Sequence, residues 1–368
     1  MINVNVDLMG LNGKVSGEVA TYLNKHGKLD PGTLRPFLGS DGRTYVTIYS
    51  GSGDPKKKEN YVTFQLQANA TLRRDEWKAL DDVVIQVSRE RLGGIQDLRD
   101  KGLVYNLGNA MGTTVLESHD VSDAMEAVVT MDGITRGNAD RPEYGHNYLP
   151  IPIIHVDFEI NTRELEASRN MSNPIDTTSA ESAARKVNEK LEDMLFTNST
   201  YSFGEKDSRN RNTIYSYLNY PDRNQVSLAK DWVTTASAAE IVADVTAMKK
   251  ESMDNYHYGP WMLYIPAAYE TRLDEDYSVS GGSLQTIRDR IMKISGIIGI
   301  KVVDRLTAGN VLLVQMTSDT VRIVNGMGIQ TVQWKEEGQF ITKYKVMTIQ
   351  VPQIRSDYNR KSGIVHLA

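Results

Sequence analysis

Three side chains that could bind a metal ion or move a proton stand at every second position: His155, Asp157 and Glu159. The positions beside them are all apolar, namely Ile154, Val156, Phe158 and Ile160. Successive side chains of a β-strand point to opposite faces. The pattern therefore predicts a strand with one apolar face and with an imidazole and two carboxylates on the other. Such a set could hold a metal ion or perform acid–base chemistry.

These three residues alone would make a poor metal site. Alternate side chains of a strand lie about 6.5–7 Å apart, so all three could share an ion only on a curved strand or with ligands from elsewhere. The remaining histidines form no H-E-x-x-H motif and no close pair in the sequence: His26, His119, His146, His257 and His366. Half-solvated strands routinely alternate in this way. We therefore expect the polar face to contact solvent, a neighbouring strand or another subunit.

Other common chemistries lack their residues. The chain has no cysteine, which excludes disulfides, thiolate metal ligands and cysteine nucleophiles. No G-x-S-x-G elbow occurs. The glycine-rich segment GNAMGTT lacks the lysine and the spacing of a phosphate-binding loop. We expect no catalytic residue, no cofactor site and no metal site. A metal-dependent enzyme that uses His155, Asp157 and Glu159 remains the less favoured alternative.

Charge and hydropathy exclude two further classes. The 368-residue chain has a formal net charge of -5 and no strongly basic block, unlike a dedicated nucleic-acid reader. The most apolar window, residues 291–303, is too short and too interrupted to span a bilayer. The first residues lack the basic start and apolar core of a signal peptide. We expect a protein made in the cytosol, with no membrane contact.

The elements around these residues do not suggest one compact domain. Residues 1–72 resemble an arm, in which the alternating runs 44–49 and 61–67 predict a β-hairpin. An isolated hairpin is marginally stable in water, so we expect it to pack against its own body or a neighbouring subunit. The helical period then begins at residue 73, and Gly93-Gly94 is predicted to end that helix.

A second unusual segment covers residues 103–148, which have no helical period and are rich in Gly and Asn. Long non-helical stretches are usually functional or extend away from the body. We expect an outlying two-stranded loop built from residues 113–118 and 125–131. After the strand that carries His155, Asp157 and Glu159, a long helix is predicted over residues 176–198, with a Thr178-x-x-Glu181 capping box. Its apolar stripe comprises Ala184, Val187, Leu191 and Leu195.

Helices and strands alternate from residue 238 to about 328, and strand-like segments end the chain. The sequence predicts an arm, a projecting loop and a long helix with one apolar face, but no group of residues that would form a catalytic site. This combination is unusual for an enzyme. Segments that cannot bury themselves within one subunit find burial on other copies of the chain. This pattern of elements therefore indicates a structural protein that assembles with copies of itself.

Eight segments, taken together and in this order, resemble one known family. They are DEWKALDDVVIQVSRERLGG, GLVYNLGNAMGTTVLE, VTMDGITRG, LPIPIIHVDFEINTRELEASRN, AARKVNEKLEDMLFTN, GPWMLYIPAAYETRL, DRLTAGNVLLVQMT and VPQIRSDYNRKSGIVH. The sequence is similar to the major capsid proteins of tailed bacteriophages, of the Hong Kong ninety-seven fold, in the branch closest to encapsulin shell proteins. The resemblance covers roughly residues 70–368.

The resemblance implies an α+β fold with named parts. They are an N-terminal arm with a hairpin (1–72), an N-terminal helix (73–102), an extended loop (103–148), a peripheral domain (149–235) with its spine helix (176–198), an axial domain (236–330), and C-terminal strands returning to the peripheral domain (331–368). Inter-subunit contacts are expected from the loop and the hairpin: Thr113, Val115, Met125, Val128, Met131, Arg136, Arg141, Tyr45, Tyr49, Tyr61 and Phe64.

The implied function is a major capsid protein. Copies of the chain would form the pentamers and hexamers of an icosahedral virion shell around double-stranded DNA, assembled in the host bacterial cytoplasm. Scaffolding, portal and decoration proteins are further candidate partners, and the acidic chain is expected to contact DNA weakly and non-specifically. An encapsulin-type nanocompartment shell is the second structural interpretation. The extra arm of about 70 residues favours the virion.

Overall fold

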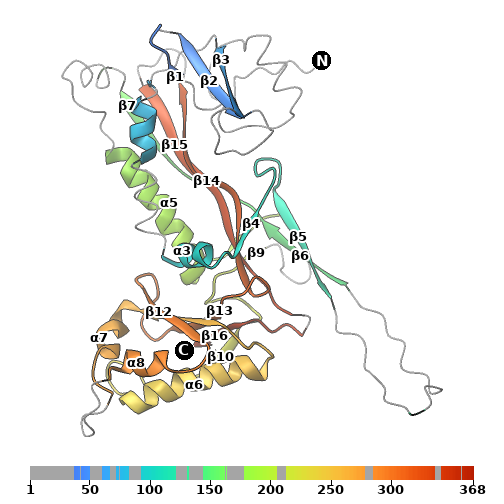
Figure 1. Cartoon of the computed structure of the whole chain (residues 1–368), viewed down its shortest axis with the longest axis vertical. Coiled ribbons are helices and arrows are strands. Elements are labelled where there is room, and N and C mark those ends of the chain that lie inside the picture. The colour runs from blue at the N-terminus through green and yellow to red at the C-terminus, as the bar shows by residue number, and fades with distance from the viewer. Residues whose placement is uncertain are drawn as a thin grey trace.

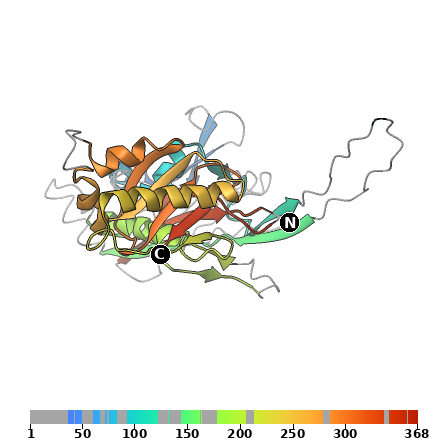
Figure 2. The ribbon, with the colours of Figure 1, turned by 90° about the horizontal axis from the view of Figure 1, so that it is seen from below.

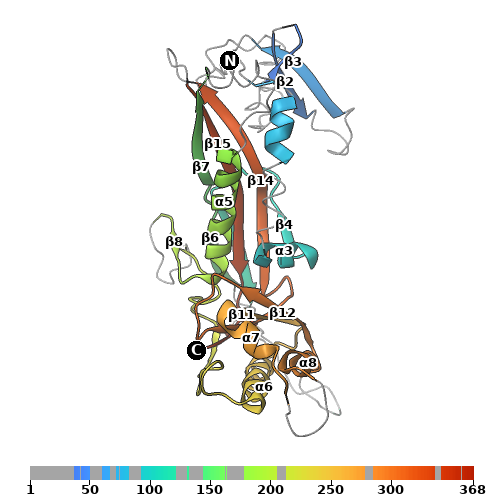
Figure 3. The same ribbon diagram turned by 90° about the vertical axis from the view of Figure 1, so that its left-hand side faces the viewer.

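A computed structural model of the chain describes most of its residues. The described residues are 37–41, 43–49, 60–66, 72–73, 75–82, 93–121, 131, 144–161, 163, 178–204, 213–277, 285–335, 341–357 and 359–368. They form an elongated molecule, with a helix-covered sheet along its middle and a second α/β unit at one end (Figures 1 and 3).

A four-stranded sheet runs along the middle of the molecule. Its strand order is β4 (Val104–Asn106), β14 (Val321–Lys335), β15 (Ile341–Ile354) and β7 (Ile154–Asn161). The two long antiparallel strands β14 and β15 extend over most of the body's length (Figure 1). The strand predicted to carry His155, Asp157 and Glu159 is β7, which lies at the edge of this sheet. It pairs antiparallel with β15, from Ile154 opposite Thr348 to Asn161 opposite Ile341.

The long helix α5 (Thr178–Phe196) lies against this sheet and contacts both β7 and β15 (Figure 3). The helix confirms the sequence prediction to within about two residues at each end. Its predicted stripe of Ala184, Val187, Leu191 and Leu195 is fully buried. A stripe repeating at three and four residues keeps one face of a helix on the core for several turns, which is why the spacing alone located it.

The prediction that Gly93-Gly94 ends a helix is wrong, because helix α3 (Gly93–Asp100) begins there. A Cβ added to Gly94 would clash with Cε2 of the Phe196 ring, so the glycine allows α3 to approach α5 closely. The Gly94 N–H also donates to the Glu192 carboxylate at 3.2 Å. The glycine therefore serves packing between two helices, which a sequence cannot distinguish from helix termination.

A five-stranded sheet forms the second unit. Its order is β10 (Asn224–Val226), β16 (Ile364–Leu367), β13 (Val311–Gln315), β11 (Trp261–Pro266) and β12 (Ile297–Val303). The position of β16 differs from the expected return of all C-terminal strands to one unit, since β16 lies between β10 and β13. All four of its residues are buried, which requires cover on both faces.

Helices of the second unit cover one face of that sheet. Helix α6 (Ala238–Asp254) starts at a capping box in which Ser237 and Glu240 exchange hydrogen bonds, and α8 (Ile287–Met292) begins with a similar box at Thr286. Two short pieces follow β11, namely η3 (Ala267–Tyr269) and α7 (Glu270–Leu273). These elements confirm the predicted alternation of helix and strand after residue 238.

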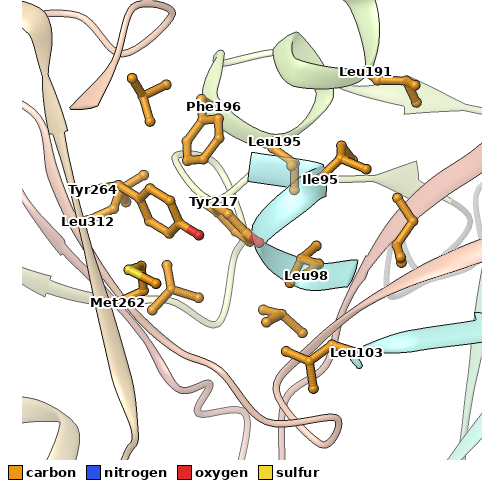
Figure 4. Packing of buried hydrophobic residues seen from close by; sticks show 14 of the residues in the cluster. Ile95, Leu98, Leu103, Leu191, Leu195, Phe196, Tyr217, Met262, Tyr264 and Leu312 are labelled. Carbon is orange, nitrogen blue, oxygen red and sulfur yellow. The ribbon is translucent and has the colours of Figure 1, made fainter. Parts of the chain in front are cut away.

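One apolar cluster joins the two units. It gathers side chains from α3, α5, β11, β13 and β14, so the central and end units share a continuous core. Figure 4 shows Phe196, Tyr217 and Tyr264 meeting there beside Ile95 and Leu98 of α3. Fully burying each such apolar side chain contributes about 1.5–3 kcal/mol.

Three small sheets lie outside these units. They are β1 (Phe37–Leu38), β2 (Thr44–Tyr49) and β3 (Tyr61–Leu66); β5 (Val115–Val121) with β6 (Tyr144–Pro150); and β8 (Tyr201–Ser202) with β9 (Thr213–Ile214). The pairing of β2 with β3 confirms the predicted hairpin. Among the described residues, no helix is both long enough and apolar enough to cross a membrane.

Candidate functional site

The polar face of β7 does not assemble a reactive site. Exposed and half-buried residues alternate along the strand, with His155, Asp157 and Glu159 exposed as predicted. His155 Nδ1 lies 3.2 Å from Asp157 Oδ1, and Lys345 of β15 lies 3.6 Å from the same oxygen. A lysine beside the carboxylate competes with any cation. His155, Asp157 and Lys345 thus form a short row of neighbouring polar and charged side chains on an exposed face of the sheet.

The apolar face of β7 packs as the alternation predicts. Ile154, Val156 and Phe158 contact the main core cluster, and α5 lies directly against the strand. Phe158 also stacks on Tyr344 of β15, with ring centroids 5.2 Å apart. Strand β7 thus packs its apolar face against α5 and the core, and its polar face points outward.

The projecting loop is built on the β5–β6 hairpin. Seven residue pairs run from Val115 opposite Pro150 to Val121 opposite Tyr144. The hairpin leaves one side of the body (Figures 1 and 2). It is anchored at its base, where Ile151 N–H donates to the Thr114 carbonyl at 2.8 Å and Leu149 joins a buried cluster.

The predicted partner of the first loop strand differs from the observed one. The two strands of the loop were expected at residues 113–118 and 125–131; the structure pairs β5 with β6, and residues 125–130 lie outside the described residues. Of the predicted contact residues in the loop, Thr113 bonds to the Asn109 carbonyl, Val115 is 37% exposed and Met131 is fully exposed. The others lie outside the described residues: Met125, Val128, Arg136 and Arg141.

The predicted contact residues of the arm lie on the β1–β3 sheet. Tyr49 and Tyr61 are opposite each other, as are Val46 and Phe64. Tyr61 is exposed, while Tyr45 is half-buried and donates its hydroxyl hydrogen bond to Asp41 at 2.6 Å. The small sheet is joined to the body by the Leu38 N–H, which donates to the Leu72 carbonyl at 3.0 Å.

Sequence reasoning missed a second group of exposed apolar side chains. They share positions in turns or short strands around the body: Ile153, Tyr201, Phe203, Tyr256 and Tyr258. Tyr256 has a backbone φ of 64°, which is uncommon for a residue with a side chain. An aromatic pair in the loop between a predicted helix and a predicted strand, as in NYHYGP, is a signal that could have identified two of them.

The strongest electrostatic perturbations lie in the shared core. Burial, with smaller contributions from the nearby carboxylates of Asp97 and Asp193, raises the pKa of Glu192 to about 7, and the hydrogen bond from the Gly94 N–H opposes this rise. Burial likewise raises the pKa of Asp97, opposed by Lys301 at 3.4 Å and by the Tyr264 hydroxyl at 3.3 Å. These carboxyls sit where α3, α5 and β11 meet.

Comparison with known proteins now bears on this arrangement. A family model described as a family of unknown function, DUF6260, matches residues 67–367. The chain belongs to the DUF6260 family. This DUF6260 chain is also 26% identical over 223 residues to the type 1 encapsulin shell protein of Myxococcus xanthus, which covers 60% of this chain and 70% of that protein.

Solved structures share the fold of this DUF6260 chain. A virus-like particle protein from Pyrococcus furiosus matches with a TM-score of 0.55 at 17% identity, over 79% of this chain and 99% of that chain. The capsid protein of Myoviridae phage XM1 matches with a TM-score of 0.56 at 10% identity, over 74% and 91%. The fold is therefore the α+β Hong Kong ninety-seven type, as the sequence resemblance implied.

Proposed function

We propose that this chain is a major capsid protein that assembles into the pentamers and hexamers of an icosahedral virion shell around double-stranded DNA. The observation that carries this proposal is the fold match, which covers nine-tenths or more of two shell-forming chains. The projecting hairpin and the exposed side chains add support, because such features gain burial when copies of the chain meet.

The proposed division of labour follows the parts of the fold. The four-stranded sheet with α5 acts as the peripheral domain, and the α6 unit acts as the axial domain around the local symmetry axes. The hairpin β5–β6 and the β1–β3 sheet lie at the outside of the body (Figure 1). In this proposal both parts contact neighbouring copies. Among the described residues, Tyr61, Val115 and Tyr144 are exposed apolar side chains on these two parts and are proposed contacts.

The chain acts by association and performs no catalysis in this proposal. Its net charge of -5 suits an inner wall that contacts DNA weakly, because a basic wall would hold the phosphates and resist their movement. Scaffolding, portal and decoration proteins are the other partners, and assembly takes place in the host bacterial cytoplasm.

A second candidate is the shell of an encapsulin nanocompartment. It is favoured by the sequence match to the Myxococcus xanthus shell protein and by the nearly complete coverage of the Pyrococcus furiosus chain. The β1–β3 sheet of the N-terminal arm favours the virion, since it adds a further surface by which one copy can hold a neighbouring copy.

Particle contents separate the two candidates. The full chain is expressed in bacteria, closed particles are purified, and nuclease-protected DNA and co-purifying proteins are measured, both from cells with the chain alone and from phage lysates. Particles that carry protected double-stranded DNA in lysates support the virion. Particles that hold a single stoichiometric enzyme and no DNA would replace it with the nanocompartment.

A further inference from the structure

Three ligand-type side chains converge on the outward face of the β5–β6 hairpin. His119 and His146 are direct cross-strand partners, and Glu117 lies two residues before His119 on the same face. All three side chains are exposed. The opposite face packs inward, because Leu149 belongs to a buried cluster and the partly buried Leu116 packs against that cluster. The trio therefore stands on a ribbon that is fixed to the body on its other side.

The distances between these groups suit a shared ion. His146 Nδ1 lies 2.7 Å from Glu117 Oε1, and the two imidazole rings meet edge to face with centroids 4.8 Å apart. One potential ligand atom from each of the three residues lies within 4.8 Å of the others. Ligands of a tetrahedral zinc ion are separated by about 3.3 Å, given bonds of about 2.0–2.1 Å. Small rotations of exposed side chains close that difference.

We propose that Glu117, His119 and His146 bind one divalent transition-metal ion. Two imidazole nitrogens and one carboxylate oxygen are a donor set that zinc, cobalt, nickel and copper favour, whereas magnesium and calcium require mostly oxygen ligands. Three protein ligands leave a fourth position for water or for a group from another molecule. The ion would cross-link β5 to β6, since its ligands come from both strands.

Sequence spacing hides this site. His119 and His146 are separated by 26 intervening residues, and only the register of β5 against β6 places them opposite each other. The proposal does not depend on a shell function, because it rests on the hairpin alone. It does give the projecting hairpin a means of being held rigid, since a metal bridge between two strands restricts their separation.

Binding of cobalt(II) to the purified full chain tests the site. After equilibrium dialysis, we expect about one cobalt per chain, with the visible absorption of a four- or five-coordinate ion, and displacement by zinc but not by excess magnesium. His119→Ala and His146→Ala should each weaken binding at least about tenfold, and Glu117→Gln should weaken it by a smaller factor.

The matched control is His155→Ala. This imidazole is also exposed and lies beside a carboxylate, Asp157, on a single strand. Its loss should leave cobalt binding unchanged, and circular dichroism confirms that each variant is folded. Equal binding by the wild type and the double variant His119→Ala/His146→Ala would overturn the proposal. So would displacement by magnesium, which would show a merely acidic surface.

Discussion

Glu192→Gln probes the carboxyl that is buried where α3 meets α5. Burial raises the pKa of Glu192 from its usual value of 4.5 to about 7. Between these values the folded protein holds a proton that the unfolded chain has released. The stability that the protonated group contributes is therefore fully present below about pH 4.5 and is lost as the pH rises through about 7.

The size of this effect follows from the two pKa values. The difference between 4.5 and about 7 corresponds to a loss of about 3 kcal/mol in the free energy of unfolding above the folded pKa. Glutamine has nearly the same shape, cannot ionise, and can still accept the Gly94 hydrogen bond. The variant should therefore match the wild type near pH 4 and exceed its stability by up to about 3 kcal/mol near pH 8.

Thermal unfolding of unassembled protein across this pH range measures the effect. At about 2–4 °C per kcal/mol, we expect the melting temperature of Glu192→Gln to rise by about 5 °C or more above the wild type near pH 8. Glu189→Gln, three residues earlier on α5, is the matched control. Lys186 at 2.7 Å and Arg305 at 3.2 Å lower the pKa of Glu189, so its replacement should not stabilise at high pH. A Glu192→Gln variant that is less stable than the wild type at every pH would refute the reasoning.

Three further predictions follow from burial, packing and topology. Gly94→Ala should cost about 1–3 kcal/mol in chemical unfolding, because its Cβ would meet the Phe196 ring, whereas Gly108→Ala, with open space around it, should be nearly neutral; equal costs would contradict the close packing of α3 on α5. Burial lowers the pKa of His366 to about 4, with Arg223 adding to the effect, so stability from this group is present above about pH 6.5 and is lost as the pH falls through about 4. His366→Gln should therefore unfold at a lower pH than the wild type in an acid titration followed by circular dichroism, and an unchanged midpoint would rule out this role. Deleting residues 1–40 should reduce the yield of closed particles while leaving the melting temperature of the unassembled body nearly unchanged, because the described residues of this segment, 37–40, contribute to neither of the two largest core clusters; parallel loss of both properties would argue against the arm.

Local periodicity of apolar residues correctly predicted several elements and their buried faces. The alternation of Ile154, Val156 and Phe158 with polar neighbours identified β7 and its buried face, and the stripe from Ala184 to Leu195 identified α5. In both cases the signal lies within one segment and reports which face is buried. The resemblance to capsid and encapsulin proteins then supplied the fold class, which short-range patterns could not specify.

What the sequence could not provide depends on contacts between distant segments. A Gly-Gly pair is typical of a helix end, and only the nearby Phe196 ring shows that Gly94 instead allows α3 to pack closely on α5. The position of β16 is set by burial on two sides, with Ile364 in one core cluster and Val365 in the other. The pairing of His119 with His146 depends on strand register, which no local pattern shows.

Electron cryomicroscopy of particles formed by the purified full chain tests the central claim most directly. The account predicts closed shells made of pentamers and hexamers, in which the β5–β6 hairpin of one copy lies against the body of the next. A chain that stays monomeric under all assembly conditions, with or without the other virion proteins, would contradict it.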